Sequence, residues 1–99
     1  MDDFEYIRSK LGEDELLAQL AEEAAELAQA ALKLRRAMGG AVNPSPVLLR
    51  HAELDLRAEL ADVNVCVRAL GLSFGDRDVM EVFAEKRTRW RKRLEGAEK

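Results

Sequence analysis

Four carboxylates lie on two apolar segments of the sequence, in two pairs with the same spacing. Glu23 and Glu26 lie within residues 16–34, and Glu59 and Asp62 lie within residues 47–70. Residues three apart share one face of an α-helix, so each pair can act together. An unpaired charge on an apolar surface is costly, and a divalent cation with oxygen ligands would offset it. The two pairs therefore predict one shared site for a hard metal ion.

The two pairs also occupy matching places on helical wheels. Measured from the centre of each apolar stripe at ~100° per residue, Glu23 and Glu59 both fall at roughly −60°, inside the apolar arc. Glu26 and Asp62 both fall at roughly −120°, at the edge of the arc. Glu22 points away from the stripe, at roughly −160°. The shared offsets indicate that the two helices carry two halves of one site.

Helices account for nearly all of the chain, and no segment alternates apolar and polar residues as a strand would. The apolar periodicity, the glycines and the cap residues predict helices over about residues 2–11, 13–38, 46–70 and 77–95. Gly12 separates the first two helices. Ser45 is expected to cap the third helix and Asp76 the fourth. The sequence therefore predicts an all-α fold.

The connection over residues 39–46 is short, which makes the two carboxylate helices antiparallel neighbours. Counted from this connection at ~1.5 Å per residue, the heights of Glu23 and Glu59 differ by about 4–5 Å. The connection can absorb that difference, so a site shared by both helices is geometrically feasible.

Composition narrows the class of protein. The 99 residues are 47% apolar, 5% aromatic and 35% charged, which suits one domain of helices packed on helices. A net charge of −3 argues against binding to a nucleic-acid polymer. No stretch approaches the ~20 apolar residues of a membrane span, and the first ten residues lack the order of a secretion signal. We therefore expect a soluble cytoplasmic protein without a membrane partner.

The single cysteine and the small size of the chain give two further expectations. Cys66 cannot form an internal disulfide, and its place on the apolar side of its helix predicts a buried thiol. A chain of 99 residues builds a limited core, and the first helix and the Trp90 side of the last helix need cover. A homodimer at least is therefore expected.

The last helix carries cations in and beside its apolar stripe. The stripe is formed by Val79, Phe83, Trp90 and Leu94. Lys86 falls within this stripe, and Arg89 and Arg93 flank it. Beside a carboxylate and metal cluster, these three cations could bind the phosphates of a substrate. Alternatively, Lys86 could extend its ammonium group to water or pair with a carboxylate.

The carboxylate pattern resembles a known signature. Glu22-Glu23-x-x-Glu26 followed by Glu59-x-x-Asp62 is similar to the EExxE…ExxD motif of the MazG-like, all-α nucleoside triphosphate pyrophosphohydrolases, which are related to all-α dUTPases and dCTPases. The surrounding segments LLAQLAEEAAELAQA, AELADVNVCVRALG and EKRTRWRKRLEG also resemble this family. The resemblance covers about residues 13–95 of the chain.

The resemblance implies a four-helix bundle completed by dimerisation, in an assembly that is a homodimer or a homotetramer. It also implies hydrolysis of ordinary or deoxy nucleoside triphosphates to the monophosphate and pyrophosphate, with Mg²⁺ or, as a substitute, Mn²⁺. By resemblance, the metal ligands would be Glu23, Glu26, Glu59 and Asp62. Glu23 would thereby take part in catalysis, with Glu22 acting as a base or orienting a ligand.

Three other interpretations are open at the level of sequence. The glutamates could be ordinary solvated helix residues, although Glu23 and Glu59 interrupt apolar arcs. A carboxylate-bridged di-iron bundle would need Glu-x-x-His on two helices, whereas the only histidine, His51, lies about two turns before Glu59. The apolar stripes alone would also suit a non-catalytic helical module for interaction or oligomerisation.

Overall fold

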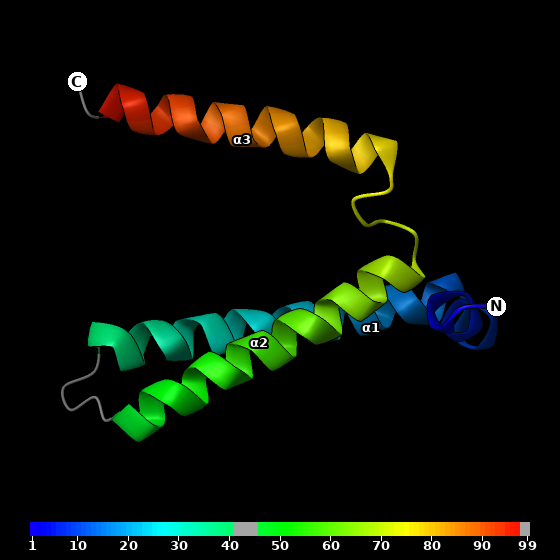
Figure 1. Ribbon diagram of the computed structural model, residues 1–99, viewed down its shortest axis with the longest axis horizontal. Coiled ribbons are helices and arrows are strands. Elements are labelled where there is room, and N and C mark those ends of the chain that lie inside the picture. Colours follow the sequence, from blue (N-terminus) through cyan, green and yellow to red (C-terminus); the bar gives the residue numbers. More distant parts are fainter. Residues whose placement is uncertain (41–45, 98–99) are drawn as a thin grey trace.

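The computed structural model describes residues 1–40 and 46–97, and these residues form helices without a strand. The elements are α1 (Asp3–Arg35), a single π-helical turn η1 (Arg36–Gly40), α2 (Pro46–Ala69) and α3 (Arg77–Ala97) (Figure 1). The predicted all-α class is therefore confirmed. Within the described part of the chain, no helix has both the length and the apolar character needed to cross a membrane.

Gly12 divides α1 into two helical segments, as the sequence predicts. Its backbone has φ 82° and ψ 164°, a conformation that only glycine adopts readily. Before the break, the side chain of Asp2 accepts a hydrogen bond of 2.8 Å from the Glu5 N–H and caps the first segment. The break turns this segment across the end of the longer helix, where Ile7 packs against the buried cluster of Leu16, Ala69 and Leu70.

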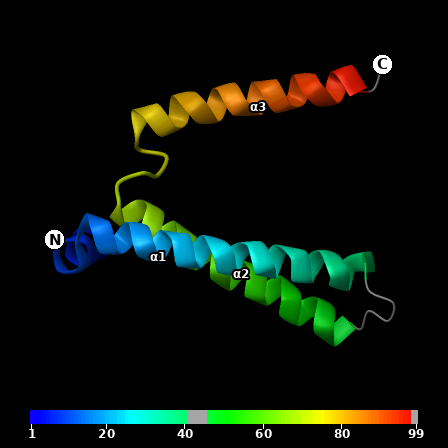
Figure 2. The same cartoon turned by 180° about the vertical axis from the view of Figure 1, so that it is seen from behind.

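The long segment of α1 and α2 form an antiparallel helical hairpin, which Figures 1 and 2 show from opposite sides. The connection between them (residues 41–45), with the expected cap Ser45, lies outside the described residues, and α2 begins at Pro46 as predicted. Among the residues whose burial the structure describes, few side chains are buried, and they follow this seam. They are Leu16, Ala30, Ala52, Cys66, Ala69 and Leu70. The small side chains among them let the two helices approach closely.

Helix α3 stands apart from the hairpin. It begins as predicted, because the Val79 N–H donates a 2.9 Å hydrogen bond to the side chain of Asp76. An edge-to-face contact between Phe74 and Phe83, with ring centroids 5.6 Å apart, joins its first turns to the preceding connection. No Cα atom of α3 lies within 8 Å of α1 or α2. The single chain is therefore an open arrangement of helices, and the four-helix bundle completed by dimerisation stays a prediction.

The Gly12 break gives a first test. A Gly12→Ala variant is expected to lower the free energy of unfolding by about 1–3 kcal/mol, because a Cβ is strained in this backbone conformation. Denaturant unfolding would measure the change. In the control Gly96→Ala, the added Cβ meets nothing within 4 Å in α3, so stability should stay level or rise slightly. Equal stability of Gly12→Ala and the original chain would contradict the observed break.

Candidate metal centre

Three carboxylates from the two hairpin helices converge at mid-length. Glu23, Glu26 and Glu59 each contribute one carboxylate oxygen, and these three oxygens lie within 4.8 Å of one another. Two of these side chains come from α1 and the third comes from α2, so the antiparallel register of the hairpin creates the group. Three of the four predicted metal ligands are thus brought together, and we call them the carboxylate cluster.

The burial of the carboxylate cluster agrees with the wheel positions. Glu23 and Glu59 are half-buried, whereas Glu26 is exposed. The Oε2 atoms of Glu23 and Glu59 are buried and have no hydrogen-bond partner. A buried carboxylate oxygen without a donor is costly. A cation between the helices would compensate both oxygens at once.

Asp62 lies beside the cluster rather than within it. Its side chain is exposed, and its oxygens are not among those that lie within 4.8 Å of one another. It is nevertheless close enough for its charge to raise the pKa of both Glu23 and Glu26. Asp62 therefore adds negative charge to the site without joining the inner group of oxygens.

Repulsion among these groups shifts their protonation. A 2.9 Å hydrogen bond from the Gln19 amide lowers the pKa of Glu23, but burial and the charges of Glu26 and Asp62 together outweigh it, so that pKa is raised. A hydrogen bond shared with Glu59 raises the pKa of Glu26, and the charge of Glu59 and burial add to this effect. Without a cation, Glu23 and Glu26 therefore hold protons more strongly than free carboxylates do.

The thiol of Cys66 borders the same region. It is buried, with 5% of its surface exposed, which confirms the prediction of a buried free cysteine. Burial raises its pKa, and the charges of Glu23 and Asp62 raise it further. The thiol is therefore a neutral, apolar neighbour of the cluster at neutral pH.

The other predicted site residues lie outside the cluster. Glu22 is exposed on α1. Lys86, Arg89 and Arg93 are exposed on α3, which does not approach the hairpin within the single chain. Their assignments to catalysis and to substrate binding stay predictions. For the three cations, that assignment requires α3 from another chain.

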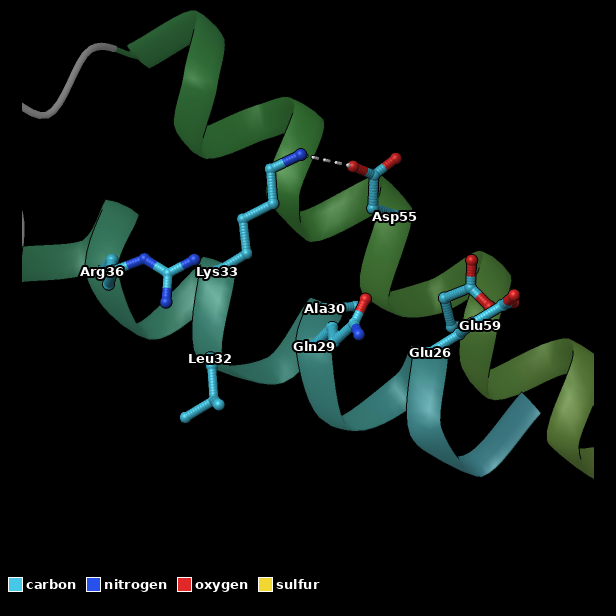
Figure 3. A pocket seen from close by; sticks show the side chains of 8 residues that line it. All are labelled: Glu26, Gln29, Ala30, Leu32, Lys33, Arg36, Asp55 and Glu59. Atoms are coloured by element: carbon cyan, nitrogen blue, oxygen red, sulfur yellow. Dashed lines mark hydrogen bonds and ion pairs between the residues drawn. The ribbon is translucent and has the colours of Figure 1, made fainter. Parts of the chain in front are cut away.

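Three residues near the cluster were missed by the sequence-based reasoning. Gln19 precedes Glu23 by four residues and hydrogen-bonds to it, a spacing that signals a shared helix face. Lys33 follows Glu26 by seven residues and forms a 3.3 Å ion pair with Asp55 on α2. Figure 3 shows Lys33 extending to Asp55 in a pocket that Glu26 and Glu59 also line. The i,i+7 spacing could have placed Lys33 on the site face.

The chemistry of these ligands fits a hard divalent ion. The cluster offers three carboxylates and no histidine or cysteine ligand. Oxygen ligands suit Mg²⁺ or Mn²⁺, and a small number of carboxylates leaves room for water and substrate oxygens. His51 is exposed and is not part of the group, so the cluster lacks the Glu-x-x-His pattern of a di-iron bundle.

The raised pKa values predict how stability depends on pH. The pKa values of Glu23 and Glu26 lie above the ordinary 4.5, so the folded chain binds their protons more tightly than the unfolded chain. Ionisation of Glu23 and Glu26 therefore destabilises the fold as pH rises from 4.5 towards their raised pKa values. In EDTA, thermal unfolding should show Glu26→Gln gaining stability over the original chain between about pH 4 and pH 7.

Mg²⁺ and a matched variant complete this test. Mg²⁺ at neutral pH should raise the melting temperature of the original chain more than that of Glu26→Gln. Glu85→Gln makes the same charge change on exposed α3. The melting temperature of this control, relative to that of the original chain, should not rise with pH in the way expected for Glu26→Gln. If the melting temperature of Glu26→Gln differed from that of the original chain by the same amount across this pH range, repulsion in the cluster would be contradicted.

Comparison with known proteins gives no further assignment of the cluster. No protein-family model, curated protein or solved structure matches this chain. Support for a metal centre therefore comes from the carboxylate geometry alone.

Proposed function

We propose that this chain hydrolyses nucleoside triphosphates to the monophosphate and pyrophosphate with the help of Mg²⁺ held by Glu23, Glu26 and Glu59. The observation that carries the proposal is the pair of buried, unpartnered Oε2 atoms on Glu23 and Glu59. They belong to facing helices, and the exposed Glu26 completes a group of oxygens within 4.8 Å. Ordinary solvated glutamates would leave no buried oxygen without a partner.

The proposed roles follow from the position and exposure of each group. Glu23 and Glu59 would hold the ion from the seam, Glu26 would add a ligand from the solvent side, and Asp62 would add negative charge beside them. When bound, the ion would neutralise charge on the polyphosphate and lower the pKa of a bound water. The role of Glu22 as the base that accepts the proton of the attacking water rests on the resemblance alone, because Glu22 is exposed and lies outside the cluster.

We further propose that the active form contains at least two copies of the chain. The single chain exposes 7988 Å², whereas a compact monomer of 11.1 kDa exposes about 5,700 Å². Its radius of gyration is 17.2 Å, against about 13 Å for a compact chain of this length. The excess surface is of the order that a stable homodimer buries on each chain.

The charge of the helices supports α3 of a second copy as the cover for the hairpin. Helix α3 carries seven Lys and Arg against four Asp and Glu, whereas α1 carries four against eight. Its apolar side is open to solvent, with Trp90 63% and Leu94 58% exposed. Packed against the hairpin of another chain, α3 would bury this stripe and bring Lys86, Arg89 and Arg93 towards the carboxylates. Counted together with the segment of α1 before Gly12, this arrangement would supply the four helices of the predicted bundle.

The proposed reaction is tested by pyrophosphate release from a panel of ordinary and deoxy nucleoside triphosphates. We expect release of pyrophosphate and monophosphate with Mg²⁺ and none with EDTA. Glu59→Gln should reduce turnover about 10–100-fold or more, because it removes a proposed metal ligand. Glu85→Gln is the matched control and should turn over normally. A folded chain that binds no metal and hydrolyses none of the panel would favour a non-catalytic interaction module instead.

The proposed assembly is tested by light scattering at micromolar concentrations. The original chain should have a mass of at least twice 11.1 kDa. Trp90→Glu should shift it towards the monomer, because it places a charge in the apolar stripe of α3. Thr88 lies roughly 150° from the centre of that stripe, so Thr88→Glu should leave the mass unchanged. A monomeric original chain would refute the assembly.

A further inference from the structure

The carboxylate cluster forms one end of a longer pocket between α1 and α2. This pocket has a volume of about 680 Å³, within the usual range for small-molecule sites. Glu26 and Glu59 line its acidic end, and Lys33, Arg36 and Asp55 line the rest together with apolar and amide groups (Figure 3). The pocket is therefore acidic at the proposed metal centre and carries two cations at the other end.

The two cations are available to a ligand. The 3.3 Å ion pair between Lys33 and Asp55 is exposed, with 58% and 53% of the two side chains accessible, so it contributes little and can exchange for another partner. Arg36 lies beyond Lys33 on the chain and forms no ion pair with any other residue in the described ranges 1–40 and 46–97. A weakly held lysine and an unpaired arginine thus face one pocket.

The spacing between the cations and the cluster suits a phosphate chain. Asp55 precedes Glu59 by one turn of α2, about 5–6 Å along the helix axis. The Lys33 ammonium, held at Asp55, therefore lies about one turn from the cluster. Adjacent phosphates of one chain could contact the metal ion at the cluster and the Lys33 ammonium simultaneously. Arg36 extends the positive charge further in the same direction.

We infer that Lys33 and Arg36 bind the pyrophosphate portion of the substrate, while Asp55 holds Lys33 in place when the pocket is empty. This inference rests on the proposed function, because it takes the cluster as the metal centre. This placement of the pyrophosphate fixes the orientation of the substrate in the pocket. The terminal phosphates point towards η1, and the nucleoside lies towards Asp62 and Cys66.

The arrangement assigns the two cations a role in the hydrolysis. The oxygen of water bonds to the α-phosphorus, and the bond from that phosphorus to the oxygen bridging to the β-phosphorus breaks. The electron pair of that bond leaves with the pyrophosphate, and the proton of the water passes to a base or to solvent. Lys33 and Arg36 would compensate the charge that develops on the departing pyrophosphate.

Inorganic pyrophosphate is the probe for this subsite, because it needs no turnover. Calorimetry would first measure Mg²⁺ binding and then the binding of pyrophosphate in the presence of Mg²⁺. Lys33→Met should leave Mg²⁺ binding intact and weaken pyrophosphate binding roughly tenfold, as expected for loss of a charge-assisted contact. Asp55→Asn should strengthen pyrophosphate binding, because it releases Lys33. With substrate, Lys33→Met should raise KM, because the contact also binds the substrate, and should lower kcat, because Lys33 compensates charge that develops in the transition state.

Lys10→Met is the matched control, because Lys10 lies on α1 before the Gly12 break and contacts the ring of Tyr6. It should bind pyrophosphate as the original chain does. If Mg²⁺ binds but Lys33→Met and the original chain bind pyrophosphate equally well, the subsite is refuted while the metal centre stands. If the original chain binds no Mg²⁺, the proposed function and this inference fail together.

Discussion

Repulsion among carboxylates in the seam between α1 and α2 is the constraint on which the site depends. Glu23 and Glu59 each place one oxygen where neither water nor a protein donor reaches it. Glu26 and Asp62 add charge from the exposed side and raise the cost of full ionisation. Apolar residues at these positions would pack the helices better, so the carboxylates weaken the hairpin. They also create a position between the helices that a cation can occupy.

The hairpin tolerates this cost because its other contacts fix the register. Leu16, Ala69 and Leu70 close one end of the seam together with the segment that Gly12 turns back. Buried Ala52 allows close approach of the helices towards the other end. The same antiparallel register brings Glu26 to Glu59 and Lys33 to Asp55, so the acidic and basic parts of the pocket have one structural origin.

The sequence predicts the helices and most of the cluster, because both depend on local periodicity. Gly12 and Asp76 mark their boundaries through backbone freedom and capping, which act over a few residues. The wheel correctly makes Glu23 and Glu59 the more buried pair. The Lys33–Asp55 pair depends on the register of two helices, which no local pattern specifies. The separation of α3 from the hairpin was also beyond such patterns, because a single sequence does not say which chain covers its apolar stripe.

The central claim is that the carboxylate cluster binds a divalent ion, and the most direct measurement is anomalous diffraction from crystals grown with Mn²⁺. The proposed site predicts an anomalous peak between α1 and α2, with oxygens of Glu23, Glu26 and Glu59 within about 2.5 Å of it. The Oε2 atoms that now lack a partner should be among these ligands. A map without a peak there, at a Mn²⁺ concentration that labels other sites, would contradict the claim.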